Sequence, residues 1–208
     1  GAKLLDILEH KTEVYHMNEG HALPMCFYLL DKYKDIKEVQ KRVVFTTHTP
    51  EKAGNEEHSI PLLHSMSFFN GLNPKQVDEY VHPENGMLNY TLTAHRLSKK
   101  ANGVSKLHAE VARKMWGDFK GICEIIAITN AQNKTCWSDP ELDKALKKND
   151  DEALVERKKE LKRKLFRVVA NQTGKLFDEN VLTIVWARRF AAYKRANLLL
   201  SDFNRFLK

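Results

Sequence analysis

The chain has 208 residues and a formal net charge of +7, and 42% of its side chains are apolar and 29% are charged. This is enough apolar sequence for about one domain with a buried core. The apolar runs are too short to span a membrane, and the first residues lack the apolar segment of a signal peptide, so we expect a cytoplasmic protein without membrane contacts. The positive charge favours an anionic ligand but does not choose between phosphate, phosphosugar, nucleic acid and an acidic surface.

Cysteine usage gives no sign of a structural cross-link. Cys26, Cys123 and Cys136 are odd in number, lie far apart and form no CxxC pair. This spacing favours neither a disulfide framework nor a zinc knuckle. A reducing compartment is therefore the expected setting.

Apolar runs alternate with amphipathic stretches along the chain. Strands are expected at 13–17, 42–47, 124–129 and 181–186, and helices after the first strand and over 60–81, 88–98, 106–116 and 150–173. The polar stretch 49–59 predicts a long loop, and residues Asn102 to Val104 predict a turn. Strands that alternate with helices indicate an α/β fold with a Rossmann-like parallel sheet and flanking helices.

Two helices have clear end signals. Asp139 is expected to be the N-cap of a helix whose first residue is Pro140. Gly174 is expected to close the long helix over 150–173. We interpret this long helix as a structural brace without chemistry of its own.

Polar residues follow the predicted strands. Glu19 and His21 come after the first strand, His48 after the second, Asn130 after the third and Arg189 after the last. In parallel sheets, ligands bind beyond the carboxyl ends of the strands. The sequence therefore predicts that these residues share one crevice.

The last predicted strand leads into a cluster of cations. Arg188, Arg189, Lys194 and Arg195 follow the run 181–186, at the start of a helix expected near Phe190. A helix N-terminus with an arginine fork and a lysine can hold a dianion such as phosphate. The alternative is a basic helix whose outer face is simply solvated.

Neutral hydrogen-bonding groups opposite an anion site suit a polyhydroxylated ligand that carries a phosphate. His48 and Asn130 are such groups, and a glycosyl phosphate is the simplest such ligand. The sequence contains neither an HExxH nor a GxSxG motif, so metal ligation and Ser/His/Asp catalysis are not indicated. The carboxylates do not form an evident glycosidase pair, although Glu19 could balance charge.

Five segments carry a resemblance to a known family. They are HMNEGHA at 16–22, FTTHTP at 45–50, ANGVSKLHAEV at 101–111, AITN at 127–130 and ARRFAAYKR at 187–195. In this order they resemble the α-glucan phosphorylases, particularly the shorter bacterial and archaeal type. The resemblance implies a glycosyltransferase with two Rossmann-like domains, pyridoxal 5'-phosphate as cofactor, and reversible phosphorolysis of α-1,4-glucan to α-D-glucose 1-phosphate with retention.

The resemblance also implies a division of the chain and a role for each matched residue. Residues 1–135 resemble the end of the N-terminal domain, 136–178 connecting helices, and 179–208 the first strand and helix of the C-terminal domain. The implied catalytic residues are Glu19, His21, His48, Arg189 and Lys194. The implied substrate contacts are His48, Asn130, Tyr193 and Arg188, and the implied cofactor contacts are Asn102, Gly103 and Val104, with no metal ligand.

Two departures from the family pattern have consequences. Ala131 and Gln132 stand where the family usually has glycine and a short aliphatic residue, which changes the loop after Asn130. The lysine that would form the Schiff base is expected downstream of Lys208. We therefore expect that the 208 residues alone neither bind the cofactor covalently nor carry out phosphorolysis.

Two other functions remain open at this point. A nucleotide-sugar-dependent glycogen or starch synthase would share the two-domain fold and use similar cations, although 101–111 and 187–195 fit a phosphorylase better. A nucleic-acid-binding module would use the basic residues at 158–164, but these alternate with Glu156 and Glu160 and favour a solvated face. We expect glucan, phosphate and glucose 1-phosphate as partners and no nucleic acid. Regulation, including allostery, and homo-oligomer formation are left open.

Overall fold

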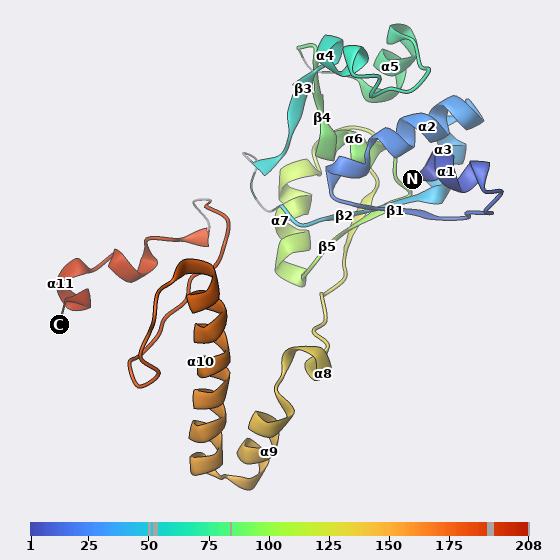
Figure 1. Cartoon of the computed structure of the whole chain (residues 1–208). Coiled ribbons are helices and arrows are strands. Elements are labelled where there is room, and N and C mark those ends of the chain that lie inside the picture. Colours follow the sequence, from blue (N-terminus) through green and yellow to red (C-terminus); the bar gives the residue numbers. More distant parts are fainter. Residues whose placement is uncertain (50, 52–53, 84, 191–193, 208) are drawn as a thin grey trace. The chain divides into compact units, whose positions relative to one another are not determined.

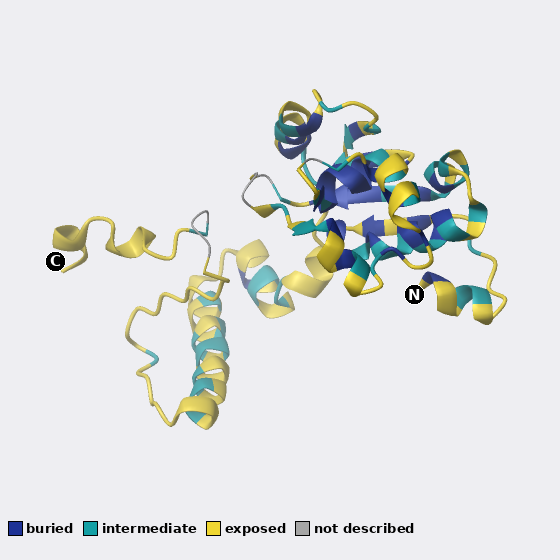
Figure 2. Cartoon of the chain, turned by 90° about the horizontal axis from the view of Figure 1, so that it is seen from above, coloured by how far each residue is buried: buried dark blue, intermediate teal, exposed yellow. Residues whose placement is uncertain are grey.

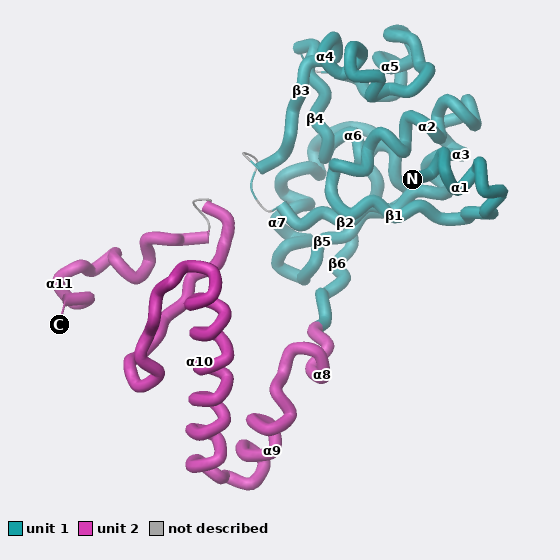
Figure 3. Tube along the Cα trace, in the orientation of Figure 1, with its two compact units in different colours: residues 1–131 teal, residues 132–208 magenta. Residues whose placement is uncertain are grey.

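A computed structural model describes residues 1–49, 51, 54–83, 85–190 and 194–207. The chain divides into two compact units, residues 1–131 (unit 1) and residues 132–208 (unit 2), which Figure 3 shows in different colours. Each unit is described by itself. No helix in the described ranges is both long and apolar enough to cross a membrane.

Unit 1 is built on a four-stranded parallel sheet (Figure 1). The strands lie in the order β1 (Tyr15–Asn18), β2 (Val43–Thr47), β5 (Lys100–Gly103) and β6 (Glu124–Ala127). Every neighbouring pair is parallel, with Asn18 opposite Thr46, Thr46 opposite Asn102 and Asn102 opposite Ile126. The predicted α/β fold with a parallel sheet is confirmed.

The core of unit 1 lies between this sheet and its helices. The helices of this layer are α2 (Pro24–Tyr33), α3 (Ile36–Arg42), α6 (Tyr90–Arg96) and α7 (Lys106–Trp116), and α1 (Ala2–Ile7) contacts α2. Along β1, buried Tyr15 and Met17 alternate with exposed His16 and Asn18, so the apolar side chains face the core. The buried residues concentrate around the strands in Figure 2. The Phe45 ring meets the His95 ring of α6 edge to face, with 5.0 Å between centroids.

A small accessory layer interrupts the alternation. Strands β3 (Glu57–Ser59) and β4 (Met87–Asn89) pair antiparallel, and α4 (Ile60–Ser65) and α5 (Pro74–Val81) lie between them in the chain. The helical stretch expected at 60–81 consists of two helices, because α4 ends before Gly71 and α5 begins at Pro74. The stretch 49–59 is expected from its sequence to be a loop, but its last three residues form β3. Pairing with β4, distant in sequence, decides this strand.

The turn expected at Asn102 to Val104 is wrong, because part of this segment belongs to strand β5. Asn102 and Gly103 are the last two residues of β5 and not part of a turn. Hydrogen bonding to β2 and β6 on its two sides overrides the weak strand propensity of KANG. A Cβ atom at Gly103 would lie 2.7 Å from Ala109 N and 2.9 Å from Ala109 Cα. Gly103 therefore lets α7 begin directly against the strand.

Unit 2 contains the helices α8 (Lys134–Trp137), α9 (Pro140–Lys148) and α10 (Asp151–Thr173). The Asp139 side chain accepts hydrogen bonds from the N–H groups of Glu141 and Leu142, as expected for an N-cap. Gly174 closes α10 with a positive φ of 71°. Both end signals predicted from the sequence are confirmed.

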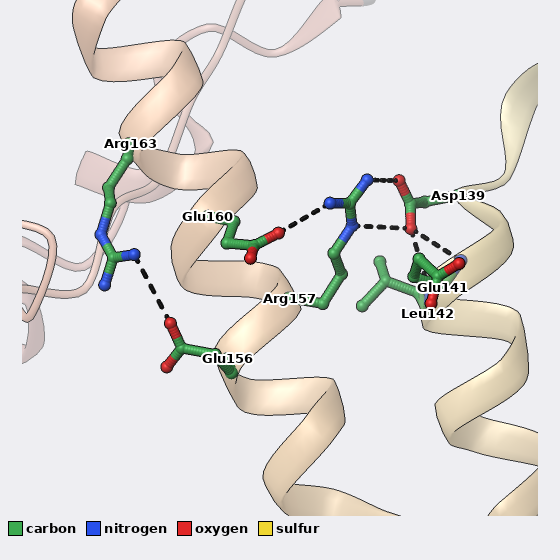
Figure 4. Close-up of polar contacts among 7 residues, drawn as sticks. All are labelled: Asp139, Glu141, Leu142, Glu156, Arg157, Glu160 and Arg163. Atoms are coloured by element: carbon green, nitrogen blue, oxygen red, sulfur yellow. Dashed lines mark hydrogen bonds and ion pairs between the residues drawn. The ribbon is translucent and has the colours of Figure 1, made fainter.

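An arginine joins α10 to the cap of α9. Arg157 donates to both carboxylate oxygens of Asp139, with Nε–Oδ1 and Nη2–Oδ2 distances of 3.0 and 2.7 Å (Figure 4). The Arg157 guanidinium and the two backbone N–H groups lower the pKa of Asp139 to about 2. The same carboxylate therefore caps one helix and holds the other.

The strand predicted at 181–186 is absent. Residues 182–190 form neither helix nor strand, and Leu182, Ile184 and Val185 are 85%, 63% and 65% exposed. The helix predicted near Phe190 is also absent up to Phe190, and the next described elements are η4 (Leu198–Leu200) and α11 (Phe203–Phe206). A parallel strand is stable only beside another strand, and the described part of unit 2 contains no strand that could pair with it.

Candidate functional site

The carboxyl ends of the four strands of unit 1 meet at one edge of the sheet. Glu19 follows β1, His48 follows β2, Val104 follows β5, and Asn130 lies three residues after β6. Thr47, Gly103 and Ala127 occupy matching positions of neighbouring strands, so the residues that follow them leave the sheet together. The structure thus brings the predicted residues of unit 1 to a common edge.

Glu19 connects the ends of β1 and β2. The His48 N–H donates to Glu19 Oε1 at 2.5 Å, and Thr49 Oγ1 donates to the same oxygen at 3.1 Å. The Glu19 N–H donates to the Thr46 carbonyl at 2.9 Å. Glu19 has φ 67° and ψ 172°, a conformation that almost only glycine adopts without strain. Three hydrogen bonds therefore hold Glu19 in a strained backbone conformation where β1 and β2 end.

The His48 side chain is oriented by the end of β1. Its Nε2 lies 2.6 Å from Asn18 Oδ1. Because an amide oxygen can only accept, Nε2 carries the proton and a neutral His48 ring presents Nδ1 as an acceptor. His48 is exposed, and its Nδ1 has no hydrogen-bond partner within the described residues. This nitrogen can accept a hydrogen bond from a ligand hydroxyl.

A second set of hydrogen bonds crosses three strands on the more exposed face of the sheet. His16 Nε2 lies 2.7 Å from Thr46 Oγ1, and Thr46 Oγ1 donates to Asn102 Oδ1 at 2.7 Å. The Thr46 hydroxyl therefore accepts from His16 and fixes the carboxamide of Asn102. No sequence pattern marks His16 and Thr46 as supporting residues, because their contact depends on the register of β1 with β2.

The ends of β5 and β6 are linked by backbone hydrogen bonds. The Ile128 N–H donates to the Gly103 carbonyl at 3.0 Å, and the Asn130 N–H donates to the Val104 carbonyl at 2.9 Å. The Val104 N–H donates to His108 Nδ1 at 3.1 Å. Both backbone groups of Val104 are thus used inside the protein, while its side chain is partly exposed. The exposed Asn130 is held beside Val104 despite the unusual Ala131 that follows.

His21 lies at the margin of this edge. It belongs to η1 (Gly20–Ala22), its side chain is 73% exposed, and its Nδ1 lies 3.8 Å from Glu56 Oε1. The turn is fixed by Gly20, where a Cβ atom would lie 2.9 Å from Tyr90 Cβ. A ligand at the edge could reach the His21 ring without desolvating a buried group.

The predicted phosphate-binding cations lie in unit 2. Arg188 and Arg189 are exposed, and Trp186 Nε1 donates to the Lys194 carbonyl at 3.3 Å. Tyr193 lies outside the described residues. The approach of these cations to His48 and Asn130 stays a prediction.

Two further features of the described residues concern metal ligands and the basic face of α10. Among the described residues, no group of three or more His, Cys, Asp or Glu side chains is placed to hold a metal ion. On α10, Arg157 donates to Glu160 at 2.7 Å and Arg163 to Glu156 at 3.4 Å, as Figure 4 shows. Paired charges of this kind belong to a solvated helix face and do not form a continuous basic stripe.

The chain is similar in sequence to two phosphorylases. A maltodextrin phosphorylase of Thermococcus litoralis is 30% identical over 258 aligned positions, which cover 100% of this chain and 31% of that protein. A glycogen phosphorylase of Aquifex aeolicus is 27% identical over 260 positions, which cover 99% of this chain and 38% of that protein. The chain resembles the α-glucan phosphorylases.

The resemblance to the α-glucan phosphorylases extends over nearly the whole chain but over only part of the relatives. An uncharacterised protein of Methanocaldococcus jannaschii is 47% identical over all 208 residues, which are 39% of its length. The chain therefore spans between 31% and 39% of the length of these three relatives. No protein-family model matches the chain.

Proposed function

We propose that the chain is part of an α-glucan phosphorylase-type glycosyltransferase, which interconverts α-1,4-glucan plus phosphate and α-D-glucose 1-phosphate with retention. The observation that carries this proposal is the gathering of Glu19, His48, Val104 and Asn130 at one edge of a parallel sheet. Ligands of α/β proteins bind at such an edge. The resemblance to maltodextrin and glycogen phosphorylases gives the edge its expected ligand.

The glucosyl unit would bind to unit 1. His48 Nδ1 and the Asn130 carboxamide have no hydrogen-bond partner among the described residues and would bind sugar hydroxyls. Glu19 and His21 would form the wall near the anomeric carbon. Arg188, Arg189 and Lys194 would bind the phosphate, and Tyr193 a sugar hydroxyl. Cations held beside the phosphate would neutralise its charge and position it for attack on the anomeric carbon.

The residues at the end of β5 fit one wall of a pyridoxal phosphate site. Asn102 is oriented by Thr46, Gly103 has no side chain, and the partly exposed Val104 side chain can lie against a ring. When bound, this cofactor would supply a phosphate group for the acid–base step. Because the chain spans between 31% and 39% of the relatives, we expect the 208 residues alone to lack phosphorolysis and covalent cofactor binding.

The organisation inferred from the sequence is retained as part of the proposal. Residues 1–135 would be the end of an N-terminal Rossmann-like domain, 136–178 connecting helices, and 179–208 the start of a C-terminal domain. The apolar segment 181–186 would then become a strand only beside strands of that domain. Its exposure in the present structure is compatible with this role.

Binding of glucose 1-phosphate to the 208-residue chain tests the proposal. In a titration followed by amide NMR, we expect saturable shifts at His48, Val104 and Asn130. Galactose 1-phosphate, which differs from glucose 1-phosphate only in the orientation of one hydroxyl group, should give smaller shifts. His48→Ala should weaken the response, whereas His10→Ala, at an exposed histidine outside the edge, should not.

Three outcomes would contradict the proposal. Absence of any shift at the edge would mean that no sugar phosphate binds there. Equal shifts with inorganic phosphate would indicate an anion site without sugar recognition. Shifts that require a nucleotide sugar would indicate the synthase-type alternative.

A further inference from the structure

His108 is a buried histidine that the proposed function does not use. It lies in the first turn of α7, where its N–H donates to the N-cap Ser105 Oγ at 3.0 Å, and it is 8% exposed. The close approach of α7 to Gly103 places the histidine directly behind the end of β5. His108 is therefore next to the candidate site but inside the protein.

The protonation of the His108 ring follows from its contacts. Nδ1 accepts a hydrogen bond from the Val104 N–H at 3.1 Å, so this nitrogen carries no proton. Burial lowers the pKa of His108, which keeps the ring neutral near pH 7. A neutral ring with an unprotonated Nδ1 has its proton on Nε2.

Nε2 of His108 is a buried donor. It has no solvent exposure and no hydrogen-bond partner among the described residues. The Thr49 backbone is near enough to raise the pKa of His108 by weak hydrogen bonding, although it forms no hydrogen bond of ordinary length with Nε2. The charge of Glu19 also raises the pKa of His108, and His48 lowers it. Buried donors in proteins are nearly always paired, so an acceptor is expected in the loop after β2.

We propose that His108 is a positioning residue that joins the end of β5 to the loop carrying His48, with Nδ1 held by the Val104 amide and Nε2–H donating to the backbone of the loop at Thr49. The two ring nitrogens lie on opposite sides of the imidazole, so one side chain can fix both loops. Glu19 binds the same loop from the side of β1. His48 is thus held from both sides, and its imidazole keeps the direction set by Asn18.

This inference deepens the proposed function, because it names what holds the sugar-binding histidine. It differs from a space-filling role, in which only the volume of the ring would matter. The two roles can be separated because asparagine and glutamine each reproduce one nitrogen of histidine. The substitution His108→Asn places an oxygen near the position of Nδ1, and His108→Gln places an amide NH₂ near the position of Nε2.

The first test measures the tautomer in the unmodified chain. Long-range proton–nitrogen NMR of the 15N-labelled 208-residue chain at pH 7 should show His108 as the Nε2–H tautomer, with a slowly exchanging ring proton. Through-bond correlations from the His108 backbone assign the ring, so this measurement needs no variant. An Nδ1–H tautomer, a charged ring or a ring proton in rapid exchange with water would overturn the proposal, even if neither variant folds.

The second test compares amide exchange in the two variants. His108→Asn should leave the Val104 amide protected and speed exchange of the His48 amide, whereas His108→Gln should do the reverse. We expect changes of roughly threefold to tenfold, as for the loss of one ordinary hydrogen bond. Identical effects of the two substitutions on both amides would indicate a space-filling role and overturn the proposal.

Glucose 1-phosphate binding distinguishes failure of this inference from failure of the proposed function. If the tautomer and the crossed exchange pattern are found but no sugar phosphate binds, His108 positions the loop and the proposed function is wrong. If glucose 1-phosphate binds but the crossed pattern is absent, the proposed function stands and the role of His108 is wrong.

Discussion

The His48 N–H donates a hydrogen bond of 2.5 Å to the carboxylate of Glu19, a residue whose own backbone is in a conformation that favours glycine. The contact joins the ends of β1 and β2, the first two strands of the sheet. Strained residues of this kind persist where surrounding contacts hold them and are frequent in binding sites. The pair therefore connects stability with the geometry of the candidate site.

At position 19, a glycine variant should be more stable than an alanine variant. Glu19→Ala removes the hydrogen bonds to His48 and Thr49 and keeps the strained backbone, and we expect a loss of about 1–3 kcal/mol. Glu19→Gly also removes them but relieves strain worth about 1–3 kcal/mol. Because the entropic cost of glycine is only about 0.5–1 kcal/mol, Glu19→Gly should be the more stable variant.

Urea unfolding followed by amide NMR signals of unit 1 measures this order. Glu19→Gln serves as a control, because its side-chain oxygen can still accept from the His48 N–H. If Glu19→Ala were as stable as Glu19→Gly, the backbone at residue 19 would not be strained.

Gly103→Ala should destabilise unit 1. The new Cβ would lie 2.7 Å from Ala109 N and 2.9 Å from Ala109 Cα, and these backbone atoms can move only if α7 moves. We expect a loss of roughly 1–3 kcal/mol, as for other overpacked sites. Gly71→Ala is the matched control, because its nearest neighbour is Asp31 Oδ2 at 3.2 Å, the end of a side chain. Equal unfolding midpoints for the two variants would contradict the close packing of α7 on β5.

His95 should make unit 1 less stable in mild acid. Burial lowers the pKa of His95 to about 4, and the neighbouring Cys123 Sγ, 4.0 Å from Nδ1, belongs to a thiol whose pKa burial raises to about 12. The unfolded chain has an ordinary histidine pKa of about 6.5, so it binds a proton that the folded protein excludes. The contribution of neutral His95 to the free energy of unfolding is therefore fully present above about pH 6.5. It decreases as the pH falls towards 4, by about 3 kcal/mol in total.

The variant His95→Phe isolates this effect. It keeps a ring against Phe45 and removes the titrating group, so its stability should fall less between pH 6.5 and 4. His10→Ala, at an exposed histidine, should follow the profile of the parent chain. Parallel profiles for His95→Phe and the parent would show that His95 is not the group responsible.

The Asp139–Arg157 pair should govern the acid stability of α9 and α10. The pKa of Asp139 is lowered to about 2, chiefly by Arg157, so its stabilising effect is present above the unfolded carboxyl pKa of about 3.9. The effect is lost as the pH falls through about 2. Arg157→Ala should reduce helix stability at pH 7. Between pH 4 and 2, the stability of this variant should fall less than that of the parent chain.

Circular dichroism during thermal unfolding of unit 2 from pH 7 to 2 provides the measurement. Lys158→Ala, on the same helix and without an ion pair among the described residues, is the matched control. The parent chain and Arg157→Ala should become similar near pH 2. A constant difference between them at every pH would mean that Arg157 acts through packing and not through the carboxylate.

The helix ends and the class of fold were determined by the sequence itself. Asp139, Pro140 and Gly174 mark their helix ends through contacts within one turn, so a local pattern is enough to find them. The runs that became β1, β2 and β6 were recognisable because each has enough apolar residues for a strand. Their alternation with helices also placed Glu19, His48 and Asn130 at the same edge.

Only the tertiary structure decided which segments pair and how the site is held. Lys100–Gly103 becomes a strand because β2 and β6 lie on either side of it, whereas the more strand-like 181–186 has no neighbouring strand among the described residues of unit 2. The conformation of Glu19 and the buried Nε2 of His108 likewise depend on contacts between residues far apart in sequence. Strand pairing and burial are non-local, and their free energy is not encoded in the composition of any one segment.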